Sequence, residues 1–263
     1  MIKTFLLMSI LSFLEYSLSF ALIKTNYTLN QFVTDLETGC EGDCYIAIIS
    51  DSLNAKDIWN NYIKAIGGAD NLLKVRDSTV ILESNIGGQK IVLMTYQKMP
   101  DKMRQIITCS SITQDIYFDG GNGVIKIGGK KINMAGGELE KLKYESMINL
   151  IINIDSLGVK LTSDGIEEVN NKDCYKIELH LPSGTIITQY FDLKTWLKVK
   201  QIEKVSVTQK YFVQETYFNY YREVMCVKYP FSIKESLGSQ SMDLTVTSVK
   251  VNTDIDDGLF VIK

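Results

Sequence analysis

The sequence predicts a mainly β protein, built as a long antiparallel sheet with two helical segments inserted into it. Residues 165–204 give the clearest sign, because they read as three strands joined by two turns. Between Tyr175 and Leu181 apolar and polar residues alternate, which is the period of a strand with one buried face. Pro182-Ser183-Gly184 then supplies turn residues, and similar strand patterns separated by Gly or Pro occur along most of the chain.

Composition bounds the class of protein. The chain has 263 residues, 45% hydrophobic and 22% charged, which suits a globular protein with a sizeable core. The net charge is −3 and positive and negative residues are interspersed, so no basic surface for nucleic acid is predicted.

The sequence contains a single histidine, which excludes most catalytic sites that depend on histidine. A Ser-His-Asp triad, a Cys-His pair or a multi-histidine zinc site would each need His180, which lies in mid-strand on the polar side of the alternation. We interpret His180 as a solvated strand residue. No metal cluster or dinucleotide motif is found either, so we predict a protein that is not an enzyme and has no cofactor.

The first 21 residues have the pattern of a secretory signal. Lys3 gives a basic start, Phe5–Leu14 is an apolar run of signal-peptide length, and Ser19 and Ala21 are small residues at a cleavage site. The alternatives are an uncleaved anchor or a buried strand. We predict export, a signal peptide over 1–21, an N-terminal segment of unassigned role over 22–50, and one domain over 51–263.

The five cysteines do not form a metal-binding pattern. Cys40 and Cys44 are spaced so that they could pair with each other in an oxidising compartment. Glu37 stands where a lipoprotein signal needs an aliphatic residue, so Cys40 is interpreted as not lipidated. Cys109, Cys174 and Cys226 fall within strand patterns and are expected to behave as small apolar residues.

Helical periodicity marks two places. In residues 51–75, apolar residues recur at helical spacing and Gly67-Gly68 ends the first helix, after which Ala69–Lys74 forms a short second one. Glu138–Ile151 is the other helical stretch. Its expected apolar face consists of Leu139, Leu142, Met147 and Leu150.

Strands are predicted over most of the remainder. Their expected ranges are Thr79–Asn85, Gln89–Lys98, Lys102–Cys109, Gln114–Asp119, Val124–Ile127, Tyr175–Leu181, Ile186–Phe191, Trp196–Glu203, Lys210–Arg222, Cys226–Ile233 and Met242–Val251. The glycines around 120–129 do not fit a phosphate-binding loop. The aspartates at 254–257 do not fit a calcium loop and are interpreted as turn or capping residues.

Several motifs resemble the outer-membrane lipoprotein-sorting (LolA-like) superfamily. They are DIWNNYIKAIGGADNLLKVRDSTV, YQKMPDKMRQII, YFDGGNGV, DCYKIEL with PSGT and QYFDLKTWLKVK, and VNTDIDDGLFVIK. The resemblance covers roughly Ser52 to Lys263. Val124 and Ile125 stand where the family usually has an aromatic residue after the YFDGGNG turn.

The resemblance implies an unclosed antiparallel β-barrel, or strongly curved sheet, with helices covering the concave face and an apolar cavity beneath them. It implies a periplasmic carrier that binds the acyl chains of lipoproteins or lipids and moves them toward the outer membrane. Its partners would be that cargo and the sorting machinery of the inner and outer membranes. The alternative is a non-catalytic binding or accessory module of the envelope, with the same scaffold and a filled core.

Large side chains from the helices and strands are expected to line or plug one apolar space. The predicted lipid-binding residues are Trp59, Tyr62, Ile66, Met94, Tyr96, Arg104, Leu142, Met147, Leu150, Phe218, Tyr220, Tyr229 and Phe231. Among them, Arg104 is expected to hold a helical lid, as the family places an arginine near this point; the alternative is an arginine on the exposed face of a strand. In an open cavity, Leu142→Glu or Met147→Glu would weaken lipid binding more than stability, whereas a filled core reverses that order.

Overall fold

A computed structural model describes residues 53–207, 210–238 and 240–262 of the chain. The predicted signal peptide over 1–21, the segment 22–50 and the Cys40–Cys44 pair lie outside the described residues. Of the described cysteines, Cys109 and Cys174 are buried, Cys226 is exposed, and all three are free thiols.

The first two helices form where the periodicity predicts them. Helix α2 spans Ala55–Ala65 and helix α3 spans Ala69–Leu73. Asn54 begins α2, because its side-chain oxygen accepts a hydrogen bond of 2.9 Å from the backbone N–H of Asp57. Gly67 separates the helices with φ of +131°, and its Cα lies so close to the Cys226 carbonyl that a Cβ would be 2.2 Å from that oxygen.

All described strands join one antiparallel sheet. The strands are β1 (Asp77–Ile86), β2 (Gln89–Lys98), β3 (Lys102–Cys109), β4 (Ile112–Phe118), β5 (Gly123–Ile127), β6 (Lys130–Asn133), β7 (Lys160–Glu168), β8 (Asp173–His180), β9 (Ile186–Asp192), β10 (Lys198–Val207), β11 (Lys210–Val224), β12 (Val227–Leu237) and β13 (Gln240–Val251). The 13-stranded order is β6-β5-β4-β3-β2-β1-β13-β12-β11-β10-β9-β8-β7. The sheet is open, since its edge strands β6 and β7 do not pair with each other, and the predicted mainly β, unclosed antiparallel class is confirmed.

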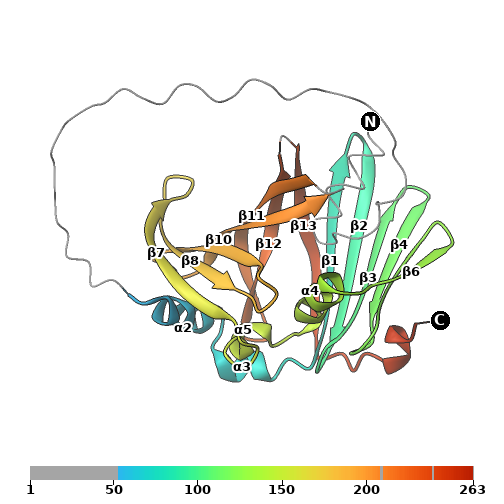
Figure 1. Ribbon diagram of the computed structural model, residues 1–263, viewed down its shortest axis with the longest axis horizontal. Helices are drawn as coiled ribbons and strands as arrows, with labels where there is room; N and C mark the ends of the chain where they lie inside the picture. Colours follow the sequence, from blue (N-terminus) through green and yellow to red (C-terminus); the bar gives the residue numbers. More distant parts are fainter. Residues whose placement is uncertain (1–52, 208–209, 239, 263) are drawn as a thin grey trace.

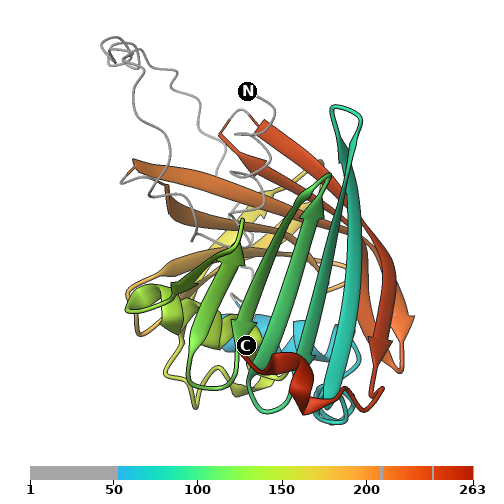
Figure 2. The same cartoon turned by 90° about the vertical axis from the view of Figure 1, so that its right-hand side faces the viewer.

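The two halves of the sheet run in different directions, and the helices lie on one side of them. Strands β7–β10 cross the direction of β1–β6 in both views (Figures 1 and 2). Helices α2, α3 and α5 lie together near one end of the strands, and α4 lies between them and the β1–β6 half (Figure 1). None of the helices in the described part of the chain is both long and apolar enough to cross a membrane.

Period-two alternation assigns each side chain to one of two faces. Leu82 of β1 pairs with Leu93 of β2, and Leu93 pairs with Ile107 of β3. All three are buried in one cluster with Leu142 of α4, so we call this side the helix face and the opposite side the outer face.

The predicted helix over Glu138–Ile151 is broken in two. Helix α4 spans Gly137–Ser146 and helix α5 spans Leu150–Asn153. The backbone is extended at Met147, with ψ of 109°, so the helical hydrogen bonds cannot continue through it. Strands β6 and β7 were absent from the sequence prediction because most of their side chains are exposed and show no apolar alternation.

The carboxylate of Asp77 fixes the end of the chain to the start of β1. It is 3% exposed, and it accepts hydrogen bonds from the Thr253 N–H at 2.8 Å, the Thr253 hydroxyl at 3.1 Å and the Asp254 N–H at 3.1 Å. Further along, Asp256 caps the 3-10 turn η1 (Asp257–Phe260) by accepting from the Gly258 N–H at 2.7 Å, as the capping interpretation of these aspartates predicted.

We expect Asp77→Ala to lower the free energy of unfolding by about 2–3 kcal/mol, because three hydrogen-bond donors lose the one buried acceptor that they share. Asp243→Ala, at an exposed position on β13, is the matched control and should change stability by less than about 0.5 kcal/mol. Urea unfolding followed by circular dichroism measures both. Equal effects of the two substitutions would contradict the role given to Asp77.

Candidate functional site: the helix face of the sheet

Two apolar clusters occupy the helix face. The α4 cluster gathers buried side chains of β1–β5, β12 and β13 around Leu142 of α4. The α2 cluster gathers buried side chains of α2, α3, β8 and β9 beneath α2. The predicted residues Trp59, Tyr62 and Ile66 all belong to the α2 cluster.

The α2 cluster is densely filled. The ring centroids of Tyr62 and Phe191 are 4.9 Å apart, and Trp59 meets both rings edge-on, at 5.7 Å from Tyr62 and 6.2 Å from Phe191. Ile58 and Phe191 are 0% exposed. Burial raises the pKa of the Tyr62 hydroxyl well above its usual value, so the group stays neutral. These residues therefore fill the space under α2 and do not form the lining of an open cavity.

A polar row separates the two clusters. Successive cross-strand pairs run from Ile177 of the α2 cluster to Met242 of the α4 cluster. The residues between them, one on each strand from β9 to β12, are Gln189, Gln201, Thr216 and Glu235. Hydrogen bonding is incomplete here, since the buried Oε1 of Gln189 has no hydrogen-bond partner among the described residues. The helix face is therefore amphipathic, with apolar areas on either side of a polar band.

Helix α4 spans from one half of the sheet to the other. On the β1–β6 side, Leu142 is 1% exposed and approaches Gly123 so closely that a Cβ there would be 2.9 Å from its Cδ2 atom. On the other side, the Lys141 ammonium pairs with the Glu203 carboxylate of β10 at 2.8 Å. Leu139 packs against the same cluster, and the Gln97 side chain of β2 donates a 2.8 Å hydrogen bond to the Glu145 carbonyl, so apolar, hydrogen-bond and ion-pair contacts together hold the helix.

Helix α5 is apolar yet weakly held. Its residues Leu150, Ile151 and Ile152 are all only partly buried. The Trp59 indole N–H of α2 donates a 2.9 Å hydrogen bond to the Ile151 carbonyl, and Lys56 of α2 pairs with Asp155 just beyond α5.

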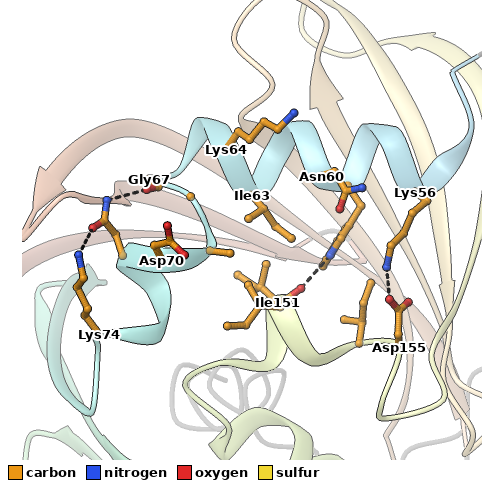
Figure 3. A pocket seen from close by; sticks show the side chains of 15 residues that line it. Lys56, Asn60, Ile63, Lys64, Gly67, Asp70, Lys74, Ile151 and Asp155 are labelled. Carbon is orange, nitrogen blue, oxygen red and sulfur yellow. Dashed lines mark hydrogen bonds and ion pairs between the residues drawn. The ribbon is translucent and has the colours of Figure 1, made fainter.

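A groove lies between α2, α3 and α5 (Figure 3). It has a volume of about 790 Å³, with isoleucines of α2 and of the α5 region forming its apolar lining. Lys64, Asp70 and Lys74 are among the charged residues around it. Its position shows that α5 is accessible from the surface on this side.

The strand residues predicted to line one space are divided between two faces. Phe218 and Phe231 pack against the α4 cluster, and Tyr229 packs against the α2 cluster. Tyr220 is 65% exposed at an irregular position of β11 with φ of +58°, and so does not reach a cluster.

Met94 and Tyr96 lie on the outer face, because the alternate residues of β2, including Leu93, face the α4 cluster. The predicted grouping of these two residues with the helix residues is therefore not found. Both parities of β2 are apolar in this stretch, so periodicity alone does not choose between them.

Arg104 makes its polar contacts with a neighbouring strand and not with a helix. Its guanidinium makes two hydrogen bonds, of 3.0 and 2.7 Å, to Asp115 of the neighbouring strand β4 on the outer face. Tyr117 donates to the same carboxylate at 2.6 Å, and the guanidinium lies 4.8 Å from its ring centroid. Asp115 keeps the pKa of Arg104 raised. The expectation that Arg104 holds a lid is corrected: it belongs to an outer-face network.

One helix-face group was missed at the sequence level. Lys198 of β10 lies beside Gln201, and burial lowers the pKa of its ammonium to about 8. The alternation of residues counted from Trp196 does not indicate that Lys198 has a special position. An irregularity in the pairing between Lys198 and Lys200 sets which face of the sheet Lys198 occupies. Within the described residues, no group of three or more His, Cys, Asp or Glu side chains could hold a metal ion.

No family model matches the sequence, and no curated protein matches it. Similarity appears in solved structures. A DUF1329 family protein from Desulfovibrio piger superposes with a TM-score of 0.53 at 11% identity, covering 79% of this chain and 97% of that one. A LolA superfamily protein from Nitrosomonas europaea gives 0.51 at 11% identity, with coverages of 80% and 99%.

This chain has the LolA-like fold. A domain from Vibrio parahaemolyticus described as a putative outer membrane lipoprotein-sorting protein gives a further match, with a TM-score of 0.50, 11% identity and coverages of 78% and 94%. The structural similarity establishes the LolA-like fold, as the sequence motifs indicated. Because the sequence identities are this low, function has to be argued from the site.

The structure predicts different losses of stability for a substitution within α4 and one just beyond its end. Leu142→Glu should lower the free energy of unfolding by about 3–5 kcal/mol, since it buries an unpaired charge against the α4 cluster. Met147→Glu should cost less than about 1 kcal/mol, because Met147 is partly exposed just beyond α4. Chemical unfolding of both variants tests this, and a larger loss for Met147→Glu would refute the placement of α4.

Proposed function

We propose that this chain is a periplasmic carrier that holds acyl chains of lipoproteins or lipids on the helix face of its sheet and shields them in transit toward the outer membrane. The observation that carries the proposal is α5, an apolar helix of four residues with no buried side chain, whose Ile151 and Ile152 pack at the edge of the α2 cluster. Such an element is stabilised little by its own packing and can be displaced.

A comparison of free energies favours displacement of α5 by an acyl chain. Each buried CH₂ contributes about 0.8 kcal/mol, so a long chain offers on the order of 10 kcal/mol before ordering costs. The contacts of α5 that would be lost are those of three partly buried side chains and the Trp59–Ile151 hydrogen bond. The comparison with LolA-like structures supports this direction, since one of them is described as a putative lipoprotein-sorting protein.

A second candidate function is a non-catalytic envelope module with a filled core. The dense aromatic packing of Trp59, Tyr62 and Phe191 favours it for the α2 half of the helix face. The two candidates therefore differ over the α4 half and α5, where Phe218, Phe231 and the α5 side chains are only partly buried.

Titration of the delipidated protein with a neutral fluorescent acyl lipid distinguishes them. We expect saturable binding at one site, and native mass spectrometry of freshly purified protein should show a co-purified lipid. Absence of both would overturn the carrier and leave the filled module. Transfer to the inner- and outer-membrane sorting machinery, as partners of the carrier, would then be tested with loaded protein.

Ile152→Gln should weaken lipid binding by several-fold while changing the free energy of unfolding by less than about 1 kcal/mol, since Ile152 is partly exposed on α5. Ile186→Gln is the matched control, because Ile186 is 47% exposed on β9 away from both clusters. The control should bind as the unaltered protein does. Equal binding by all three proteins would contradict a role for α5.

A further inference from the structure

Lys198 projects onto the helix face at the junction of the two apolar clusters. Its ammonium nitrogen lies 4.4 Å from the ring centroid of Phe218, which packs against the α4 cluster. Its Cα pairs with that of Phe191, a member of the α2 cluster. The ammonium donates a 3.3 Å hydrogen bond to Oε1 of Gln201 in the polar row.

No carboxylate among the described residues forms an ion pair with Lys198. The lysine two positions along β10, Lys200, differs in this respect, because it faces the outer side and pairs with Glu215 at 2.7 Å. Desolvation by the surrounding protein is the cause that lowers the pKa of Lys198 to about 8. An ammonium that is desolvated without an opposite charge is a costly arrangement for the free protein.

Other ionisable groups on this face do not supply that charge. Glu203 lies five residues along β10, about 16 Å away by strand rise, and pairs with Lys141 of α4. Glu235 lies two strands beyond Gln201, about 10 Å from it. The hydroxyl of Tyr221 donates to the Lys198 backbone carbonyl at 2.9 Å, and burial raises its pKa and those of Tyr62 and Tyr229, so these phenols remain neutral.

We propose that Lys198, with Gln201 and Phe218, forms a headgroup site that binds the carboxylate or phosphate of an amphiphile whose acyl chain lies on the apolar helix face. The ammonium and the polar row would take the anionic head, and the clusters on either side would take the chain. The ligand class is thus an anionic amphiphile. This inference rests on the proposed carrier function and adds the polarity and charge of the cargo to it.

Binding of such a head should depend on pH with a definite sign. The anion stabilises the protonated lysine, so binding raises the pKa of Lys198 above its free value of about 8. Affinity is then fully present below about pH 8 and is lost as the pH rises. At pH 9 the affinity for the anion should be up to about tenfold weaker than at pH 7.

The test is isothermal titration of the delipidated protein with dodecanoate, dodecyl phosphate and dodecanol, which share one chain and differ in the head. We expect the unaltered protein to prefer the anionic heads over dodecanol by on the order of tenfold at pH 7. The ratio between dodecanoate and dodecyl phosphate shows whether a fatty acid or a phospholipid head fits better.

Lys198→Met should keep dodecanol binding and lose the preference for the anions together with its pH dependence. Lys200→Met is the matched control and should keep both. The inference is overturned if Lys198→Met retains the preference, or if the unaltered protein binds the acid and the alcohol equally. Failure of all three ligands to bind would overturn the carrier function itself, and a thermal melt shows that each variant is folded.

Discussion

A continuous antiparallel sheet of 13 strands commits alternate side chains to one face, and the rest of this structure depends on that commitment. The described helices that lie on one face of this sheet are short, with 11 residues in α2, five in α3, 10 in α4 and four in α5. Leu142 of α4 packs among the buried apolar side chains of the α4 cluster. Between the helices, side chains such as Phe218 and Phe231 stay partly exposed on a face that would otherwise be core.

The two halves of that face differ in how they are completed. Helix α2 brings Trp59 and Tyr62 against Phe191, and aromatic packing fills the space. Helix α4 reaches the opposite half mainly through Leu142, and the Lys141–Glu203 ion pair ties it back across the face. Leu139 and the Gln97 side chain also hold α4, so the two halves differ in the kind of contact: aromatic packing in one, and aliphatic packing with polar contacts in the other.

Polarity on the helix face argues against an entirely apolar cargo. The row from Gln189 to Glu235 places polar side chains where an apolar sheet would pack more stably. Incomplete hydrogen bonding at Gln189 lies at the same place as Lys198, which has no acidic partner in the part of the chain that the structure describes. Arg104, by contrast, has its partners Asp115 and Tyr117 on the outer face, so it completes a surface network and leaves nothing for a ligand.

The sequence by itself determined the class and most of the elements. The turn residues Gly87-Gly88 and Pro100-Asp101 placed β2 and β3 at their observed bounds, and helical spacing ended by Gly67-Gly68 placed α2, because these signals act within a few residues. Only the tertiary structure decided where β2 turns Met94 and Tyr96, since both parities of that strand are apolar and its pairing with β1 and β3 selects the face. It also decided the break at Met147 and the inward turn of Lys198. A backbone irregularity and long-range pairing set these, and no local period records them.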